Sequence, residues 1–411
     1  MERGLVKTKG GENFLLPFIL ITSLFFLWGF AHSILDVLNK HFQDTMEITR
    51  TRSALIQAVV YGGYFLMALP AGSIIRKYGY RTGVITGLVL YAIGALMFIP
   101  GGRMNSFEFF LLSLFIIGCG LTCLETAANP YVTVLGDPES SERRINLAQS
   151  FNGIGWIAGP LAGGYFLFAC NGDITTPYTI IGVVVLIVAM IFIKVKLPEI
   201  SMEAGDTEVS SSCRSFDNVS IWKKRTFTVG LVSLFLYVAA QTGINSFFIN
   251  YATENVGIDA HEASVWLSFG GMGMFVAGRM GGSYIMKFMR GETLLGICAA
   301  GATLMMLCVI MLDGNIALFS FFLCFLFESI MFPTIFALAI KETGRETKKA
   351  SSYLIMSIVG GAVAPLVMGA IADNVSMAAG FVVPMLCFIA IGVYASVYNR
   401  VRQDRTEQNQ G

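Results

Sequence analysis

The chain has 411 residues, of which 55% are hydrophobic and only 13% are charged, and its mean hydropathy is +0.67. Soluble domains carry about 25% charged residues, so the composition excludes an ordinary soluble protein and indicates one that lies in a lipid bilayer. The net charge of +1 gives no reason to expect nucleic acid or a strongly acidic protein as a partner.

Twelve apolar segments follow one another along the chain, and several exceed the roughly 18 residues that mark a membrane-spanning helix. We expect each segment to form one transmembrane helix, which predicts an all-α membrane protein. The segments are 14–37, 54–75, 83–100, 107–135, 146–169, 177–196, 226–251, 263–287, 292–312, 315–341, 350–372 and 378–398.

The longest polar break divides these segments into two groups of six. It runs over residues 198–225 and is too short to form a domain, so it is predicted to be a solvated cytoplasmic linker. The predicted organisation is therefore an N-terminal six-helix bundle, 1–197, the linker, and a C-terminal six-helix bundle, 226–411.

The lysine and arginine residues indicate how the chain is oriented in the membrane. Of the 28 residues, 23 fall in the loops on the side that carries both termini, and four fall in the opposite loops. Cytoplasmic loops carry the excess of positive charge. Both termini are therefore predicted to be cytoplasmic.

The two halves repeat each other with offsets of about 203 to 210 residues along the sequence. Since an even number of helices separates equivalent helices, the halves have the same orientation, and parallel six-helix repeats are typical of transporters with a substrate site near the midplane between the halves. The matches are GSIIRKY (72–78) with GSYIMKF (282–288), Glu125 and Pro130 with Glu328 and Pro333, Gly155, Pro160 and Gly164 with Gly360, Pro365 and Gly369, and Trp28, His32 and Asp36 with Tyr237, Gln241 and Asn245.

Polar side chains form stripes at helical spacing on four of the predicted helices. Lipid satisfies neither amides nor carboxylates, so these stripes must turn inward. Each amide has an alternative role as interhelical packing, at about 0.6 kcal/mol per hydrogen bond. The stripes are Trp28, His32 and Asp36; Glu125 and Asn129; Asn146, Gln149, Asn152 and Trp156; and Tyr237, Gln241 and Asn245.

The chemistry of these stripes suits a sugar. The C–H faces of a sugar pack on aromatic rings and its hydroxyls both donate and accept hydrogen bonds. The rings available are Trp28, Trp156 and Tyr237, and the amides are Gln149, Asn152, Gln241 and Asn245. The absence of an inward cluster of cations argues against phosphorylated or strongly anionic substrates.

The sequence carries no GxxxxGK[ST] nucleotide loop, no metal-ligand spacing and no catalytic set such as HExxH or GxSxG, so we expect neither an enzyme nor a bound cofactor or metal. An ion gradient is then the expected energy source. Carboxylates inside a membrane are costly and commonly serve as proton carriers, which makes Asp36 and Glu125 the candidates for proton coupling. Glu328 is a candidate third titrating group, or the partner of Arg279 in an ion pair.

Several stretches of the chain resemble one family. The stretches that carry this resemblance are FFLWGFAHSILDVL (25–38), GLTCLETAANPYVTVLG (120–136), INLAQSFN (145–152), YVAAQTG (237–243) and FPTIFALAIK (332–341). Through them the chain resembles the major facilitator superfamily, in its fucose–galactose–glucose:proton symporter branch. The resemblance extends from the first predicted helix to the last. It implies alternating access between two six-helix bundles and proton-driven import across the inner membrane of a bacterium.

The resemblance also implies roles for individual residues. Asp36 and Glu125 match the family's residues for protonation and sugar recognition, and Gln149 and Asn152 match residues that line the cavity. The chain departs from the fucose-transporting pattern at His32, Asn245 and Glu328. L-fucose is the first expected substrate, with glucose and galactose next.

The expected partners are a neutral monosaccharide, protons and the lipid bilayer, with no nucleic acid, and the expected assembly is a monomer. Two alternative functions remain at this point. One is an exporter of a small molecule on the same fold, which would have a more apolar cavity. The other is a sugar sensor that binds without transport, which usually carries an additional cytoplasmic segment.

Overall fold

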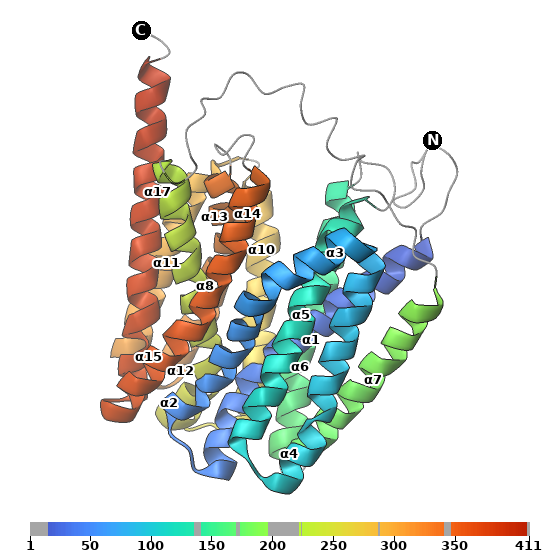
Figure 1. Ribbon diagram of the computed structural model, residues 1–411. Coiled ribbons are helices and arrows are strands. Elements are labelled where there is room, and N and C mark those ends of the chain that lie inside the picture. The colour runs from blue at the N-terminus through green and yellow to red at the C-terminus, as the bar shows by residue number, and fades with distance from the viewer. Residues whose placement is uncertain are drawn as a thin grey trace. The chain divides into compact units, whose positions relative to one another are not determined.

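The computed structural model of the chain is helical throughout the part that it describes, with no strand in that part (Figure 1). The described residues are 15–134, 141–169, 173–195, 222, 224–286, 288–340 and 347–408. The predicted linker, 198–225, therefore lies outside the described residues except for Trp222, Lys224 and Arg225. The prediction of an all-α fold is confirmed.

The described residues form two compact units. The first contains the residues up to Glu47 and those from Val59 to Met202, and the second contains Ile48–Ala58 and the residues from Glu203 onward, in each case over their described part. The predicted bundle boundaries do not anticipate that Ile48–Ala58 groups with the second unit.

The first unit is built from long helices joined by short turns. In chain order these are α1 (Leu15–Met46), α3 (Leu55–Leu96), α4 (Phe98–Met104), α5 (Phe107–Val134), α6 (Ser141–Gly164), the π-helical turn η2 (Tyr165–Ala169) and α7 (Thr175–Lys194). The first residues of α3 belong to the second unit. The helices α1 and α6 pack closely, since the Ser33 hydroxyl donates to the carbonyl of Gly155 at 3.2 Å.

The element α3 consists of two membrane spans that meet at a sharp turn, as its two arms in Figure 1 show. Gly79 has φ 83° and ψ 169° inside it, a conformation that an L-residue with a Cβ atom rarely adopts. The two arms belong to the candidate membrane spans Arg50–Ile75 and Lys77–Met104, and Gly79 lies near the start of the second span. Gly79 thus makes the tight connection between the second and third predicted helices.

The second unit has more breaks in its helices. Its elements are α2 (Arg50–Ser53), α8 (Arg225–Tyr251), η6 (Ala252–Val256), α9 (Ala260–Trp266), η7 (Leu267–Met272), α10 (Gly273–Ile285), α11 (Gly291–Met311), α12 (Gly314–Glu328), α13 (Met331–Ile340), α14 (Thr347–Met356), η9 (Ser357–Val359), α15 (Gly360–Asn374), α16 (Met377–Gly380) and α17 (Val382–Gln408). The turns η6 and η7 are π-helical, and η9 is a 3₁₀ turn.

A cluster of polar contacts attaches α2 to the second unit. Asp373, near the end of α15, accepts hydrogen bonds from the backbone N–H of Arg50 at 3.0 Å and from the Thr51 hydroxyl at 2.7 Å. The Arg50 guanidinium donates to the carbonyl of Ala372 at 2.9 Å and pairs with Glu254 at 2.7 Å. These contacts explain why a segment that is close in sequence to α1 groups with the second unit.

Ten helices within the described part are long and apolar enough to cross a membrane. The two other predicted segments are also helical over their described residues. The segment 146–169 carries the asparagine and glutamine stripe, which lowers its hydropathy, and the segment 263–287 is divided by η7. All twelve predicted segments thus correspond to helical chain.

Many large apolar side chains lie on the outside of the protein. Examples are Leu66 at 61% exposed, Phe319 at 60% and Val393 at 58%. Such surfaces are rare on soluble proteins but are required where a protein faces lipid. The inside of each unit is filled by aliphatic and aromatic side chains, and the aromatic ones include the parallel rings of Phe98 and Tyr178 at 3.7 Å in the first unit.

Candidate functional site

The first unit places three polar groups around the hydroxyl of Tyr64, a buried residue of α3. The indole Nε1 of Trp28 donates to Tyr64 Oη at 2.7 Å, and His32 Nε2 lies 2.8 Å from the same oxygen. Glu125 of α5 also interacts electrostatically with this hydroxyl. We call Trp28, His32, Tyr64 and Glu125 the Tyr64 cluster.

Aromatic rings surround the imidazole of His32 in this cluster. His32 is only 7% exposed. Its ring is nearly parallel to that of Trp156 on α6, with an interplanar angle of 12° and centroids 6.1 Å apart, and it also contacts Tyr61 and Tyr64. The predicted stripe on α1 therefore meets the predicted stripe on α6 at this histidine.

Glu125 and Asn129 share one face of α5, as their spacing predicts. Both are half-buried. The Oδ1 atom of Asn129 is buried without a hydrogen-bond partner among the described side chains and backbone. A buried amide oxygen of this kind is an acceptor that a bound hydroxyl group would satisfy.

Asp36 lies one helical turn beyond His32 on α1 and is 2% exposed. It is therefore buried like His32 and Tyr64 but is separated from Trp28 by two turns, or about 12 Å along the helix axis. The two predicted proton-coupling carboxylates occupy different elements, α1 and α5.

The two predicted sugar-binding amides of α6 have different surroundings. Asn152 is buried and its Nδ2 donates to the carbonyl of Phe25 on α1 at 3.1 Å. This bond is the interhelical role that its sequence position left open as an alternative. Gln149 is half-buried, so its side chain is the more accessible of the two.

The second unit carries its own stripe on α8, with Tyr237 and Asn245 buried and Gln241 half-buried. The Tyr237 ring packs beside Phe332 with centroids 6.1 Å apart. Asn245 Oδ1 is buried and accepts no hydrogen bond from the described part of the chain. The predicted roles of these three residues in sugar binding stay predictions.

Glu328 ends α12 and is completely buried, at 0% exposed. Neither of its carboxylate oxygens has a hydrogen-bond partner within the described residues. The neighbouring cation is Arg279 of α10, which interacts electrostatically with both Glu328 and Tyr237. Its guanidinium also lies over the ring of Phe275, 4.6 Å from the centroid.

Backbone chemistry explains why Arg279 sits at this point. Pro333 has no N–H group to donate to the carbonyl of Ser329, four residues earlier, and α12 ends at Glu328 before α13 begins at Met331. Arg279 Nε donates to that carbonyl at 3.2 Å. The proline thus creates the acceptor that holds the arginine beside Glu328.

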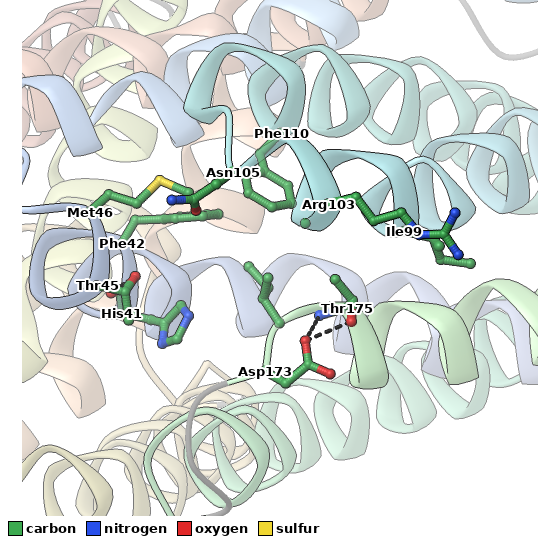
Figure 2. A pocket seen from close by; sticks show the side chains of 12 residues that line it. His41, Phe42, Thr45, Met46, Ile99, Arg103, Asn105, Phe110, Asp173 and Thr175 are labelled. Atoms are coloured by element: carbon green, nitrogen blue, oxygen red, sulfur yellow. Dashed lines mark hydrogen bonds between the residues drawn. The ribbon is translucent and has the colours of Figure 1, made fainter.

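A cavity of about 500 Å³ opens elsewhere in the first unit (Figure 2). None of the predicted site residues lines it. Its lining residues are His41, Phe42, Thr45, Met46, Ile99, Gly102, Arg103, Asn105, Phe110, Asp173, Ile174 and Thr175.

Asp173 has a structural role at this cavity, because its side chain caps the start of α7. It accepts hydrogen bonds from the Thr175 hydroxyl at 2.6 Å and from the backbone N–H of Thr175 at 2.9 Å (Figure 2). It also accepts one from the Thr176 hydroxyl at 2.7 Å. These hydroxyl groups hold the pKa of Asp173 below its ordinary value.

Within the described residues, no group of three or more His, Cys, Asp or Glu side chains has the geometry to hold a metal ion. The groups that the structure places at the candidate site are aromatic rings, an imidazole, amides and carboxylates.

Sequence reasoning did not single out Tyr64 or Asp373. Tyrosines occur commonly in the apolar segments, and the spacing of Tyr61 and Tyr64 gave no signal that one of them meets Glu125. Asp373 lies near the end of the glycine-rich helix α15, and its contact with Arg50 joins residues more than 320 positions apart. For both residues, the only signal in the sequence was that a polar side chain lies within or at the end of an apolar span.

Comparisons with known proteins agree with the family that the sequence motifs resemble. The model of the Major Facilitator Superfamily matches residues 18–358. The chain is 35% identical to the L-fucose-proton symporter of Escherichia coli (strain K12) over 411 aligned residues, covering 93% of each protein. It is 32% identical to the glucose/galactose transporter of Brucella abortus (strain 2308), covering 95% of this chain and 96% of the relative.

A solved structure agrees as well. The crystal structure of the Major Facilitator Superfamily transporter FucP in the outward conformation is 34% identical to the chain, with a TM-score of 0.66. The match covers 94% of this chain and 99% of FucP.

Proposed function

The chain belongs to the major facilitator superfamily, and from this premise we propose that it imports a neutral monosaccharide together with protons by alternating access. Relatives that match over more than nine-tenths of the chain are named as an L-fucose-proton symporter and a glucose/galactose transporter. It is a multi-pass membrane transporter and not an enzyme.

The observation that carries the proposal is that Tyr64, which interacts with Glu125, also bonds to Trp28 and lies beside His32. A carboxylate inside a membrane protein is retained for a function, and here it adjoins the hydroxyl that also binds Trp28 and His32. Rings, an imidazole and a carboxylate in one place supply both a stacking surface and hydrogen-bonding groups for a sugar. The same carboxylate is then able to link sugar occupancy to a proton.

Two carboxylates divide the coupling in this proposal. Asp36 takes up the proton from the outside, while Glu125, beside Asn129, contacts the sugar and senses its presence. In the first unit, the proposed sugar contacts are Trp28, His32 and Gln149, while Asn152 holds α6 against α1 through its bond to the Phe25 carbonyl. Tyr237, Gln241 and Asn245 contribute from the second unit.

L-fucose leads as the substrate, followed by glucose and galactose. The two groups of relatives carry different sugars in their names at similar identity, 35% and 32%. Of the three positions at which the chain departs from the fucose-transporting pattern, His32 and Asn245 lie on the predicted sugar-binding stripes, so they are the proposed determinants of which sugar is preferred.

The proposed setting is the inner membrane of a bacterium, with both termini in the cytoplasm. The distribution of lysine and arginine supports this orientation. The proposed working unit is a monomer of two six-helix bundles, 1–197 and 226–411, joined by the linker 198–225.

Uptake by proteoliposomes tests the function. The purified protein is reconstituted and supplied with radiolabelled L-fucose, D-glucose or D-galactose, with and without an inwardly directed proton gradient. We expect one of these sugars to accumulate above its outside concentration only when the gradient is imposed, and liposomes without protein provide the control. Accumulation that is independent of the gradient would contradict proton coupling.

The same preparation separates the alternative functions. A sensor would bind a sugar in equilibrium dialysis and show neither uptake nor sugar-for-sugar exchange. An exporter would bind none of the three sugars and would instead move an apolar compound out of the vesicle lumen that corresponds to the cytoplasm. Either outcome would replace the proposed import function.

A further inference from the structure

Tyr64 is the residue at which the polar groups of the first unit meet. It is 6% exposed, and its hydroxyl oxygen lies 2.7 Å from Trp28 Nε1 and 2.8 Å from His32 Nε2. The same hydroxyl interacts with the Glu125 carboxylate. One phenol group therefore contacts a ring donor and an imidazole and interacts with the proposed coupling carboxylate.

The number of protons in this group is limited. A tyrosine hydroxyl has one proton to donate, and an indole N–H only donates. Trp28 therefore donates to Tyr64 under all conditions. The single Tyr64 proton points either to Glu125 or to His32, and the direction decides what the other partner must do.

The charge of Glu125 determines which arrangement holds. A charged carboxylate accepts only, so Tyr64 then donates to Glu125 and accepts from His32, which carries its proton on Nε2. When Glu125 takes a proton from water, the carboxylic acid donates to Tyr64, and Tyr64 donates to His32 Nε2. His32 then releases its Nε2 proton to water and takes one from water on Nδ1, so the ring stays neutral.

We propose that Tyr64 is the positioning residue that transmits the protonation of Glu125 to the sugar-facing rings, by reversing its hydrogen bonds to Glu125 and His32. The consequence for the sugar is chemical: His32 Nδ1 changes from an acceptor to a donor as Glu125 is protonated. Trp28 stays fixed by its bond to Tyr64 in both states. This inference deepens the proposed function and rests on it.

The variant Tyr64→Phe tests the inference, with sugar affinity measured against pH in detergent. Removing a donor to the charged carboxylate favours protonated Glu125, so the transition in sugar affinity should move upward by roughly one to two pH units. Tyr178→Phe is the matched control. Tyr178 is a buried tyrosine of the same unit whose hydroxyl has no hydrogen-bond partner in the described part of the chain, and its pH profile should equal that of the parent.

A double substitution distinguishes positioning from general damage. If Tyr64 acts through Glu125, Tyr64→Phe should produce no further pH shift in a Glu125→Gln background, because the titrating group is already absent. An equal shift in both backgrounds would overturn the inference. So would a Tyr64→Phe protein that follows the parent profile.

The tautomer of His32 provides a readout that needs no change at Tyr64. The chain has three histidines, so the variant His41→Gln/His261→Gln retains His32 alone. Nitrogen-15 spectra of this protein should show Nε2–H above the affinity transition and Nδ1–H below it. One tautomer on both sides, or a charged imidazolium below it, would contradict the proposal.

The outcomes also separate this inference from the function on which it rests. If the parent protein shows neither sugar binding nor gradient-driven uptake, the proposed symport is wrong. If the parent does both and the Tyr64 and histidine experiments fail, only the role of Tyr64 is wrong.

Discussion

Glu125 and Glu328 occupy equivalent positions in the two sequence repeats, each five residues before a proline, and yet their surroundings differ. Glu125 lies within the continuous helix α5 and adjoins the Tyr64 hydroxyl. Glu328 ends the helix α12, is completely buried and has the cation Arg279 as its charged neighbour. One carboxylate meets neutral aromatic donors, and the other meets a fixed positive charge.

We propose that this difference gives the repeated carboxylate two roles. A neutral neighbour allows a carboxylate to gain or lose a proton with little rearrangement. A fixed cation favours the charged form, and removal of either member leaves an uncompensated buried charge. We therefore expect Glu125 to titrate during transport and Glu328 to stabilise the second unit.

The largest expected effect is that of Glu328→Gln. Glu328→Gln removes the charge with which the buried Arg279 interacts electrostatically and leaves that cation uncompensated, so this variant should show a markedly lower melting temperature in detergent or fail to express. The second substitution Arg279→Gln should restore much of the stability, because it removes the unpaired cation. Thermal unfolding of the single and double variants is the measurement.

A different outcome would assign to Glu328 the proton-coupling role that is proposed for Glu125. A stable Glu328→Gln protein with a shifted pH optimum of uptake would show that Glu328 titrates during transport.

Close packing holds Arg279 in place, and Gly278 provides a test of this packing. A Cβ atom at Gly278 would lie 2.4 Å from the carbonyl oxygen of Leu326, whereas at Gly281 on the same helix it would meet nothing within 4 Å. Gly278→Ala should therefore destabilise the protein by about 1–3 kcal/mol, and Gly281→Ala should not destabilise it. Equal melting temperatures for the two variants would contradict the packing of α10 on α12.

In the unit that contains Glu125, the two amides of α6 are expected to differ in role, one binding sugar and the other stabilising the fold. Gln149→Ala should weaken sugar binding by about 1–3 kcal/mol, because a sugar hydroxyl would lose its partner in a desolvated site. Asn152→Ala should instead lower stability by about 1 kcal/mol through the lost bond to the Phe25 carbonyl. Sugar affinity and melting temperature are measured on both, and reversed effects would exchange the two roles.

Asp173 is a third carboxylate, and it lies outside the membrane spans. Its substitution is expected to have the smallest effect on stability. Its pKa is held below the ordinary value by the hydroxyls of Thr175 and Thr176, so its charged form stabilises the folded state above the unfolded-state pKa of about 3.9. This contribution declines as the pH falls through the lower folded-state pKa. Asp173→Asn should lower stability at pH 7 by less than about 1 kcal/mol.

The pH dependence is the check on this prediction. The difference in melting temperature between the parent and Asp173→Asn should be constant above pH 5 and should shrink in more acidic solution. A difference that grows on acidification would be inconsistent with a lowered pKa.

The sequence predicted those parts of the fold and site that depend on local pattern. Twelve apolar runs indicated the helices, and a carboxylate within an apolar run identified Glu125. Helical spacing placed Trp28 and His32 on one face. The motifs identified the family without any contact information.

The features that the sequence did not predict depend on tertiary contacts. Tyr64 became significant only when α3 brought its hydroxyl to Glu125 and His32. The attachment of Arg50 and Thr51 to Asp373 joins distant segments. The anchoring of Arg279 to the Ser329 carbonyl requires both the proline and the packing of α10 on α12.

Proton uptake on sugar addition tests the division between Glu125 and Glu328 most directly. The purified proteins are placed in weakly buffered detergent solution with a pH-sensitive dye, and the transported sugar is added. The parent and Glu328→Gln/Arg279→Gln should each take up protons from solution, and Glu125→Gln should not. Proton uptake that persists in Glu125→Gln and is lost in the double variant would contradict the assignment and place the coupling at Glu328.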